Sequence, residues 1–360
     1  MISILMPAYN SAPWIEAAIR SVMAQSFTDW QLIVVDDGST DDTPRIVESL
    51  AEEDRRISML ATDHLGVANA RNVGLENISG DRVAFIDSDD LWPPYNLEAL
   101  SYLMDRFDAD IAAGSFTEFD DENGKIPGAL SNHAKYLDDD KILLLTGEEA
   151  VEDSLYQRHV MTSLWGKLYR SSLFSGLKTT IGELYEDLDL FYRVALRARK
   201  VAYTPLPLYF YRQRDNSIIH TFTPDRLCVL DVTTRICNLL SEKYPALYDA
   251  AIDRRFSANY DMLRLINICL RNRTHNEKVG ATGNDYERKG AAGNDYEKER
   301  AEKERNLFLS KREQIRQFLS LHASKELRNG NVRLKNRLGA LLFLLLPFPI
   351  LNFFLSYLKK

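Results

Sequence analysis

The segment Arg82-Val83-Ala84-Phe85-Ile86-Asp87-Ser88-Asp89-Asp90 decides how the first part of this chain is interpreted. Its apolar beginning predicts a short buried strand, and it ends in three carboxylates within four residues. Like charges this close raise one another's pKa, and a hard divalent cation relieves the repulsion. The pattern therefore indicates a metal–phosphate site at the carboxyl end of a strand, where open α/β sheets bind ligands. Taken alone, it fits a solvated acidic turn equally well.

Length and composition are those of an ordinary globular protein. The 360 residues, 45% of them hydrophobic and 27% charged, allow one large domain with an appendage, or two domains. The net charge of −7 gives no indication of nucleic-acid binding. Cys228, Cys237 and Cys269 lack metal-ligand spacing and predict buried thiols in a reducing compartment. The apolar run at residues 2–6 is too short for a signal peptide, so we expect folding to begin in the cytoplasm.

Strands and helices alternate through the first 110 residues. Short β-branched runs predict strands at residues 2–6, 31–35, 57–60 and 82–86, and helical patterns cover residues 12–24, 43–53 and 66–77. Thr43 is a candidate N-cap because Pro44 follows it. This order predicts an α/β fold with a mainly parallel sheet that helices cover on both faces.

The pattern changes twice after residue 110. Residues 110–220 predict strands at 111–119, 201–203 and 208–212, helices at 148–158 and 186–199, and a loop at 120–140. From residue 225 onward the pattern is helical, over 225–243, 246–270 and 296–326. The sequence Gly-Asn-Asp-Tyr-Glu occurs at 283 and again at 293, inside a polar stretch near 272–295 that we interpret as a linker. We therefore expect three parts: residues 1–220, 221–330 and 331–360.

Residues 338–358 carry no charge, and basic residues flank them on both sides. These 21 positions are long enough to cross a bilayer, but Pro347 and Pro349 interrupt the helix near its middle. We therefore expect a re-entrant or interfacial hairpin that contacts an anionic membrane surface. A buried core helix and an oligomer interface are the alternatives.

Polar residues also follow the other predicted strands. Pro7-Ala8-Tyr9-Asn10 follows the first, Asp36-Asp37-Gly38 the second, and Gly66 opens the helix that carries Arg71. Because parallel strands end at one edge of a sheet, we expect these groups to converge there. Asp36 or Asp37 suits ribose hydroxyls or a pyrimidine imide, the glycines permit close backbone approach, and Arg71 suits a diphosphate.

Together these motifs resemble the inverting nucleotide-sugar glycosyltransferases of family 2. The segments that carry the resemblance are Met6–Asn10, Val34–Asp41, Ala70–Gly74, Phe85–Asp90, Trp165–Tyr169, Tyr185–Asp189 and Tyr209–Arg214. It covers about residues 1–220 and implies the GT-A fold. It also implies a nucleotide-diphosphate donor, most often a UDP-sugar, and a saccharide or lipid-linked saccharide acceptor. Residues 225–360 show no such match.

The resemblance implies a role for each candidate residue. Asp87-Ser88-Asp89 matches the Asp-X-Asp motif, in which Asp87 lies near the ribose and Asp89 ligates Mn²⁺ or Mg²⁺ on the diphosphate. Asp90 is left with a structural role. The nucleoside contacts implied are Pro7, Tyr9, Asn10 and Asp36. Glu186-Asp187 matches the pair at the acceptor side, with Asp187 as general base.

Several of these candidates also fit a structural role. Glu186-Asp187 suits the first turn of a helix, where the dipole favours carboxylates. His220, a candidate metal ligand or diphosphate contact, fits a surface histidine equally well. Trp165 and Tyr169 are candidates for an aromatic wall against the acceptor sugar, with core packing as the alternative. Arg212 and Arg214 are candidates for phosphate contacts.

The expected reaction is a single displacement. A carboxylate takes the proton of the acceptor hydroxyl as it attacks, and the metal and Arg71 stabilise the departing diphosphate. A nucleotidyltransferase is one alternative, but residues 7–13 contain neither the glycine nor the basic residue that its loop needs. A non-catalytic nucleotide-sugar or glycan-binding module is another, and Glu186-Asp187 argues against it. We expect polysaccharide or glycolipid synthesis at the cytoplasmic membrane face; whether the helical tail forms oligomers stays open.

Overall fold

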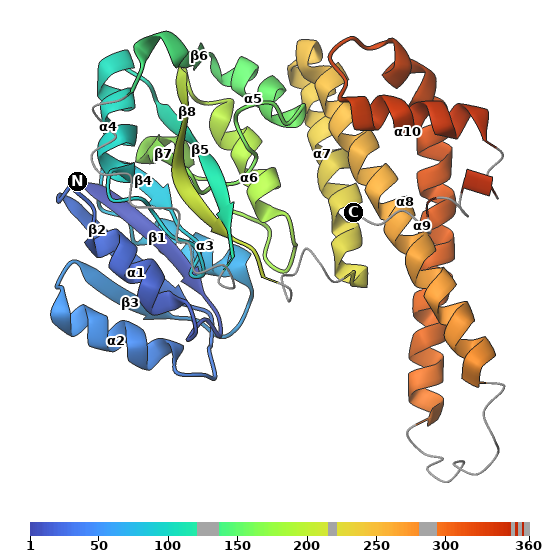
Figure 1. The fold of residues 1–360 in the computed structure, drawn as a ribbon, viewed down its shortest axis with the longest axis horizontal. Helices are drawn as coiled ribbons and strands as arrows, with labels where there is room; N and C mark the ends of the chain where they lie inside the picture. The colour runs from blue at the N-terminus through green and yellow to red at the C-terminus, as the bar shows by residue number, and fades with distance from the viewer. Residues whose placement is uncertain (121–136, 215–221, 281–293, 347–349, 352–354, 356–360) are drawn as a thin grey trace. The chain divides into compact units, whose positions relative to one another are not determined.

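The computed structural model describes residues 1–120, 137–214, 222–280, 294–346, 350–351 and 355 (Figure 1). The chain divides into two compact units, Met1–Thr221 and Phe222–Lys360. This division lies next to the expected boundary at residue 220, while residues 331–360 belong to the second unit. The expected loop at 120–140 and the repeated pentapeptides lie largely outside the described residues.

An eight-stranded sheet forms the centre of the first unit. Its order is β3 (Ile57–Ala61), β2 (Trp30–Asp36), β1 (Ile2–Ala8), β4 (Arg82–Phe85), β7 (Lys167–Arg170), β5 (Ile111–Phe119), β8 (Val201–Arg212) and β6 (Leu143–Leu145). β7 runs antiparallel to β4 and β5, and β6 runs antiparallel to β8. The remaining neighbours are parallel. The carboxyl ends of β1, β2, β4, β5 and β8 therefore share one edge with the amino end of β7.

Helices cover both faces of this sheet, which confirms the predicted fold class (Figure 1). The helices are α1 (Ile15–Met23), α2 (Thr43–Glu53), α3 (Val67–Glu76), α4 (Asn96–Phe107), α5 (Gly147–Leu155) and α6 (Glu186–Ala195). Ile4 and Met6 belong to the core that α1, α2 and α4 cover. Leu5 and Val35 point the other way and contact α3 at Gly74. β1 is buried along nearly its whole length because apolar layers cover it on both sides.

The structure corrects three local predictions. β8 is one strand rather than two, because Pro205 and Pro207 lie where its register with β5 shifts, and an irregular position tolerates proline. Thr43 is the first residue of α2 and not its cap; Asp42 precedes the helix. The helix α4 and the strands β6 and β7 were not predicted from the sequence.

The second unit is helical in its described residues, as predicted. It contains α7 (Cys228–Lys243), α8 (Tyr248–Gly280), α9 (Asn294–Arg328) and α10 (Leu334–Leu345), and a short 3-10 turn, Pro224–Leu227, precedes α7. Only Cys237 is buried as expected; Cys228 and Cys269 are half-buried, and all three are free thiols. Among the helices that the structure describes, none combines the length and apolar character needed to cross a membrane.

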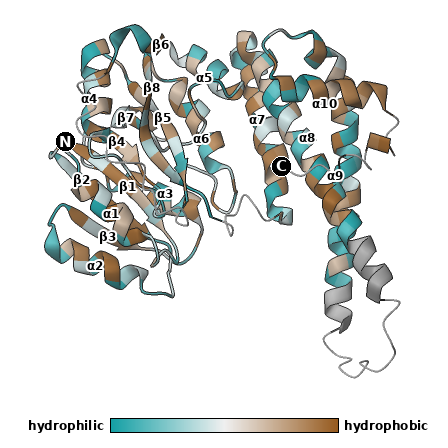
Figure 2. Cartoon of the chain, viewed as in Figure 1, coloured by the Kyte–Doolittle hydropathy of each residue, from teal (hydrophilic) through white to brown (hydrophobic). Residues whose placement is uncertain are grey.

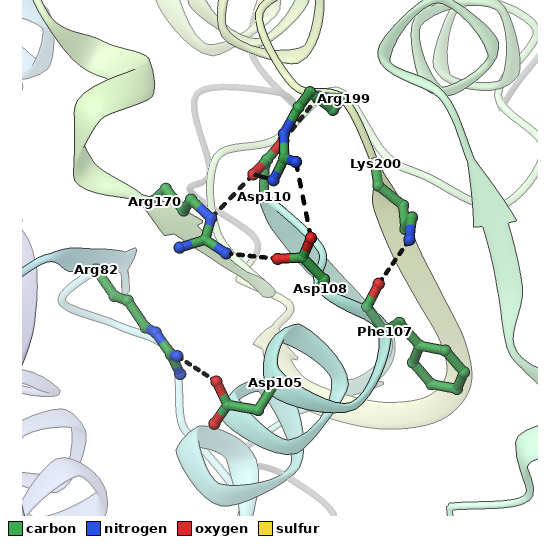
Figure 3. A network of polar contacts seen from close by, with 8 residues as sticks. All are labelled: Arg82, Asp105, Phe107, Asp108, Asp110, Arg170, Arg199 and Lys200. Atoms are coloured by element: carbon green, nitrogen blue, oxygen red, sulfur yellow. Dashed lines mark hydrogen bonds and ion pairs between the residues drawn. The ribbon is translucent and has the colours of Figure 1, made fainter.

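A network of ion pairs joins strand ends at the edge of the sheet opposite the carboxyl ends of β1, β2 and β4 (Figure 3). Asp110 precedes β5 and accepts hydrogen bonds from Arg170 Nε at 2.9 Å and from the Arg199 backbone N–H at 2.7 Å. The Arg199 side chain adds two more, and Lys200 Nζ donates to the Phe107 carbonyl at 2.8 Å. Burial raises the pKa of Asp110, but Arg199 and Arg170 more than offset this and hold it below its usual value. The network thereby fixes the starts of β5 and β8 and the end of β7.

We expect Asp110→Asn to lower the free energy of unfolding of the first unit by about 2 kcal/mol, because charged donors lose a buried acceptor. Urea unfolding followed by tryptophan fluorescence measures this, since all four tryptophans lie in residues 1–221. Because the pKa is depressed, the stabilisation is present above the ordinary pKa of aspartate and is lost as pH falls through the lower native value. Asp105→Asn is the matched control: Asp105 is exposed and pairs with Arg82, so the change should be well under 1 kcal/mol. Equal effects of the two variants would contradict this account.

Candidate functional site

Hydrogen bonds tie the loops after β1, β2 and β4 together at one edge of the sheet. Asn10 has a left-handed backbone, φ 47°, and its side-chain oxygen accepts from the Thr40 N–H at 2.8 Å. Its own N–H donates to Ser39 Oγ at 2.9 Å. The hydroxyls of Ser11 and Ser88 lie 2.7 Å apart, which links the first loop to the carboxylate turn. The convergence expected from the strand order is therefore present in the structure.

The neighbouring aspartates at the end of β2 have different surroundings. Asp36 is buried, and its Oδ2 accepts from the Ser39 N–H at 3.2 Å, while its buried Oδ1 has no hydrogen-bond partner in the part of the chain that the structure describes. Asp37 is also buried, but its two oxygens accept from Thr62, Leu65 and Gly66. Asp36 therefore keeps an oxygen that a ligand can satisfy, whereas Asp37 orders the loop that leads into α3.

Two further candidates of these loops are the exposed Tyr9 and the half-buried Gly66. Tyr9 is 44% exposed, and its ring stacks on His64 with centroids 4.0 Å apart. Gly66 has φ 91°, and nothing lies within 4 Å of the position a Cβ would take. Pro7 lies within β1 and is half-buried. An aromatic face and an open backbone position thus belong to loops at the edge of the sheet where Asp36 lies.

The carboxylate turn, Asp87–Asp90, is fastened to the end of β8. The fully buried Asp90 accepts from Tyr209 Oη at 2.7 Å and from the Arg212 N–H at 2.8 Å. The Tyr209 hydroxyl also accepts from the Asp87 N–H at 3.1 Å, and Arg212 Nε donates to the Asp89 carbonyl at 2.5 Å. Burial, with repulsion from Asp89 and Asp87, raises the pKa of Asp90 well above its usual value. Asp90 thus holds the turn in place, and Asp87 and Asp89 stay partly accessible.

A buried arginine joins this turn to the start of α6. Arg71, on α3, forms ion pairs with Glu186 and, at 3.1 Å, with Asp87. Burial lowers the pKa of Arg71, but the charges of Glu186 and Asp87 outweigh this, so its pKa rises and it stays protonated. Burial raises the pKa of Glu186 to about 7, and Arg71 opposes that rise. Three carboxylates, of Asp87, Glu186 and Asp187, therefore share the field of one guanidinium.

Asp187 is the half-buried neighbour of Glu186 in the first turn of α6. Its Oδ1 accepts from the Leu188 N–H at 2.7 Å, and the residue before the pair, Tyr185, is left-handed with φ 65°. Asp189 points elsewhere and pairs with Arg193 at 2.5 Å, as its position on the helix requires. The charge of Asp187 also acts on Lys167, a buried amine at the start of β7.

Lys167 anchors the turn before β7. Its Nζ donates to the Ser163 carbonyl at 2.6 Å, and burial lowers its pKa to about 7, an effect that Asp187 partly opposes. The turn carries Trp165, which stacks on Tyr209 with centroids 4.4 Å apart and on Tyr211 at 5.5 Å. Trp165 is half-buried. The structure thus brings an aromatic side chain to the same edge as the carboxylate turn.

Tyr169 does not join this aromatic group. It is fully buried, its hydroxyl donates to the Leu164 carbonyl at 3.0 Å, and its ring packs against Phe85 and Phe174. The alternation of a strand explains this, because Lys167 and Tyr169 share one face of β7 and that face is covered. The expectation that Tyr169 contacts an acceptor is therefore replaced by core packing.

Asp87 and Asp89 offer oxygen ligands of the kind that Mg²⁺ and Mn²⁺ prefer. Burial and the charge of Asp87 raise the pKa of Asp89, while Arg214 pairs with Asp89 at 2.6 Å. The excess of negative charge fits a divalent cation. Among the described residues, no group of three or more His, Cys, Asp or Glu is arranged to hold a metal, so ligand oxygens would have to complete its shell. His220 lies outside the described residues.

Tyr209 and Lys167 are residues of the site that the sequence motifs do not single out. Tyr209 contributes the hydroxyl that bridges Asp87 and Asp90, and Lys167 anchors the turn of Trp165. Lys167 could have been noticed as a charged residue at the start of an otherwise apolar strand. No local signal marked Tyr209, because its partners lie about 120 residues earlier in the chain.

Comparison with known proteins identifies the family. Residues 3–174 match the model of Glycosyl transferase family 2. The chain is 32% identical over 259 residues to glycosyltransferase GlyA of Streptococcus pneumoniae. This match covers 71% of this chain and 37% of GlyA. Residues 3–174 of this chain therefore form a glycosyl transferase family 2 region.

Other relatives cover parts of the same family 2 region. The chain is 42% identical over 105 residues to the Escherichia coli UDP-Glc:alpha-D-GlcNAc-diphosphoundecaprenol beta-1,3-glucosyltransferase WfgD. That match covers 29% of this chain and 41% of WfgD. The chain therefore spans less than half the length of GlyA and of WfgD.

A solved structure supports the fold of this chain. Residues 1–349 of S. aureus TarS, in complex with UDP-GlcNAc, superpose with a TM-score of 0.59 at 21% identity. The superposition covers 71% of this chain and 72% of that one. The GT-A fold implied by the sequence resemblance is confirmed.

We predict that Tyr209→Phe destabilises the first unit by about 1–3 kcal/mol, because the buried Asp90 loses a donor while the ring keeps its stack on Trp165. The measurement is urea unfolding followed by tryptophan fluorescence. Tyr211→Phe is the matched control: Tyr211 also stacks on Trp165, and its hydroxyl makes no hydrogen bond among the described residues, so stability should change by less than about 0.5 kcal/mol. A Tyr209→Phe protein as stable as wild type would refute the role given to the hydroxyl.

Glu186 should make stability depend on pH. Because its pKa is raised to about 7, its contribution is fully present below the ordinary pKa of glutamate and is lost as pH rises through about 7. Glu186→Gln removes the titration but changes the pairing with Arg71 at every pH. The unfolding free energy of wild type minus that of Glu186→Gln should therefore fall between pH 5 and 7.5, by about 3 kcal/mol at most. A difference that stays constant over this range would contradict the raised pKa.

Proposed function

We propose that this protein transfers a sugar from a nucleotide-diphosphate donor, most simply a UDP-sugar, to a hydroxyl of a saccharide or lipid-linked saccharide, with inversion at the anomeric carbon. The observation that carries the proposal is the bridge through Arg71. It places the carboxylate turn, suited to a donor diphosphate, next to the Glu186-Asp187 pair, suited to an acceptor hydroxyl.

Donor binding is assigned to the loops at the shared sheet edge. The buried Oδ1 of Asp36, which has no hydrogen-bond partner among the described residues, suits an N–H of the base, and Tyr9 offers an exposed ring in the loop after the neighbouring strand β1. Asp87 and Ser88 lie on the turn that would face the ribose and diphosphate. Asn10 holds the loop after β1 in its left-handed conformation. This assignment follows the family resemblance, residue by residue.

Asp89 and Asp87 are the residues proposed to hold a divalent cation. Bound there, Mg²⁺ or Mn²⁺ supplies positive charge to the diphosphate as it leaves. Arg214, which pairs with Asp89, and Arg71, which pairs with Asp87, keep the two carboxylates oriented. The contribution proposed for His220 rests on sequence resemblance alone.

Asp187 is the proposed general base. It sits at the amino end of α6, half-buried, with one oxygen accepting from the Leu188 N–H. Its carboxylate takes the proton of the acceptor hydroxyl while the hydroxyl oxygen attacks the anomeric carbon and the bond to the diphosphate breaks. Glu186 is engaged with Arg71 and acts on the position of Asp187. Trp165 provides an aromatic face for an acceptor sugar.

The comparisons suit an enzyme of polysaccharide or glycolipid assembly, because the name of the relative WfgD includes a diphosphoundecaprenol-linked acceptor. We propose that the catalytic unit works at the cytoplasmic membrane face on such a lipid-linked acceptor. A nucleotidyltransferase and a non-catalytic glycan-binding module remain the alternatives that the following assays exclude.

Asp187→Asn should bind UDP as the wild type does and lose transfer by about a hundredfold or more, because only the base is removed. UDP binding is measured by calorimetry, and transfer by UDP release from a panel of nucleotide sugars with acceptor present. Asp189→Asn, on the same helix but paired with Arg193, should keep transfer within about threefold. Wild-type turnover by Asp187→Asn would remove Asp187 as the base; no turnover by wild type on any donor would favour a binding module.

Chelation should abolish transfer, and Mn²⁺ or Mg²⁺ should restore it. Asp89→Asn should need a metal concentration at least about tenfold higher for half-maximal rate, because a charged oxygen ligand becomes neutral. The control is Asp42→Asn, an exposed aspartate before α2, for which the metal requirement should not move. Full activity in the presence of chelator would contradict the metal assignment.

A further inference from the structure

The helix α10 buries small and polar residues and exposes leucines, which is the reverse of the usual pattern for a surface helix. Its buried residues are Asn336, Gly339 and Ala340. Apart from Lys335, its exposed residues are leucines: Leu334 at 71%, Leu338 at 50%, Leu341 at 40%, Leu342 at 37%, Leu344 at 46% and Leu345 at 68%. Figure 2 shows the hydrophobic colouring along the second half of α10. A surface helix normally buries its leucines and exposes its polar residues, so this face has the character of an interaction surface.

Specific contacts to α8 hold α10 in this orientation. Asn336 Nδ2 donates to Asp253 Oδ1 at 2.6 Å, and both residues are buried. Gly339 lies against the ring of Tyr260, where a Cβ would be 3.0 Å from a ring carbon. Lys335 Nζ donates to Asp261 at 2.7 Å. Rotating the leucines inward would break the buried amide–carboxylate hydrogen bond and push branched side chains against Tyr260.

The charged residues in and around α10 are all basic. From residue 327 to residue 360 there is no aspartate or glutamate, although the whole chain has a net charge of −7. The basic residues of this stretch are Arg328, Arg333, Lys335, Arg337, Lys359 and Lys360. An apolar face flanked by cations is complementary to the surface of an anionic bilayer, where acyl chains take the leucines and headgroups take the charge.

The dimensions of α10 suit a helix that lies in the interface. Its 12 residues extend about 18 Å, well short of the roughly 30 Å hydrocarbon core. Its leucines at 334, 338, 341 and 345 recur at helical spacing, which gives a continuous stripe along its axis. Such a stripe enters the boundary between headgroups and acyl chains along its whole length when the helix lies flat.

We propose that the stripe formed by Leu334, Leu338, Leu341 and Leu345 docks the protein on the surface of an anionic lipid bilayer. This proposal does not depend on the reaction assigned above, because it rests on α10 and its contacts within the second unit. If the acceptor is lipid-linked, docking raises its local concentration; if it is not, the docking surface is unchanged.

The test is co-sedimentation of the full-length protein with vesicles of phosphatidylcholine alone, and of phosphatidylcholine with phosphatidylglycerol. We expect binding to the anionic vesicles, weakened by salt and at least about tenfold weaker on the neutral ones. Leu338→Gln/Leu345→Gln should reduce binding to anionic vesicles by about tenfold or more. The matched control, Leu307→Gln/Leu321→Gln, alters two exposed leucines of α9 and should bind within about twofold of wild type.

Circular dichroism and UDP release from donor are measured on all three proteins, so that loss of folding or of the reaction is distinguished from loss of docking. Three results would overturn the proposal: no binding of wild type to either vesicle, equal binding to both, or equal loss in the two variant pairs. A wild-type dimer in light scattering that Leu338→Gln/Leu345→Gln converts to a monomer, without vesicle binding, would assign the stripe to a second copy of the chain instead.

Discussion

The Arg71 guanidinium is the contact on which the geometry of the site depends. It is buried, and its charge is compensated by Asp87 on one side and Glu186 on the other. Leaving any of these charges unpaired in the interior costs several kcal/mol, so the three groups are held together. Because Asp87 follows β4 and Glu186 begins α6, this pairing fixes the distance between two loops that lie about 100 residues apart in the chain. The arginine thus gives a rigid centre to a site assembled from loops.

A second set of contacts keeps the carboxylate turn from relaxing under its own repulsion. The turn carries three aspartates, and burial with mutual repulsion raises the pKa of Asp90 and of Asp89. Tyr209 and Arg212, both on β8, donate hydrogen bonds to the Asp90 carboxylate of this turn. The cost of this repulsion is the physical reason why such a turn suits a cation and a diphosphate. The hydrogen bonds from β8 hold the turn rigid, and the negative charge that they leave uncompensated attracts a cation.

Much of this arrangement could be predicted from the sequence, because it depends on short-range patterns. The βα alternation predicts the parallel sheet, and the parallel sheet predicts that Asn10, Asp36 and Asp87 meet at one edge. What could not be predicted depends on contacts between distant residues or on which side chain a neighbour satisfies. Asp36 and Asp37 are adjacent, yet within the described residues Asp36 keeps an unpartnered oxygen and Asp37 does not, because the loop before α3 donates to Asp37. The outward leucines of α10 are likewise decided by Asn336 and Asp253, which are 83 residues apart.

The most direct test of the account is the turnover of Arg71→Lys. Lysine keeps the positive charge but has a single ammonium in place of a planar fork, so it does not bridge Asp87 and Glu186 in the same way. If the bridge positions donor and acceptor groups, kcat for sugar transfer should fall by about a hundredfold, while the Kd for UDP and the tryptophan-monitored unfolding curve change far less. Transfer at the wild-type rate by a folded Arg71→Lys protein would contradict the claim that this guanidinium organises the site.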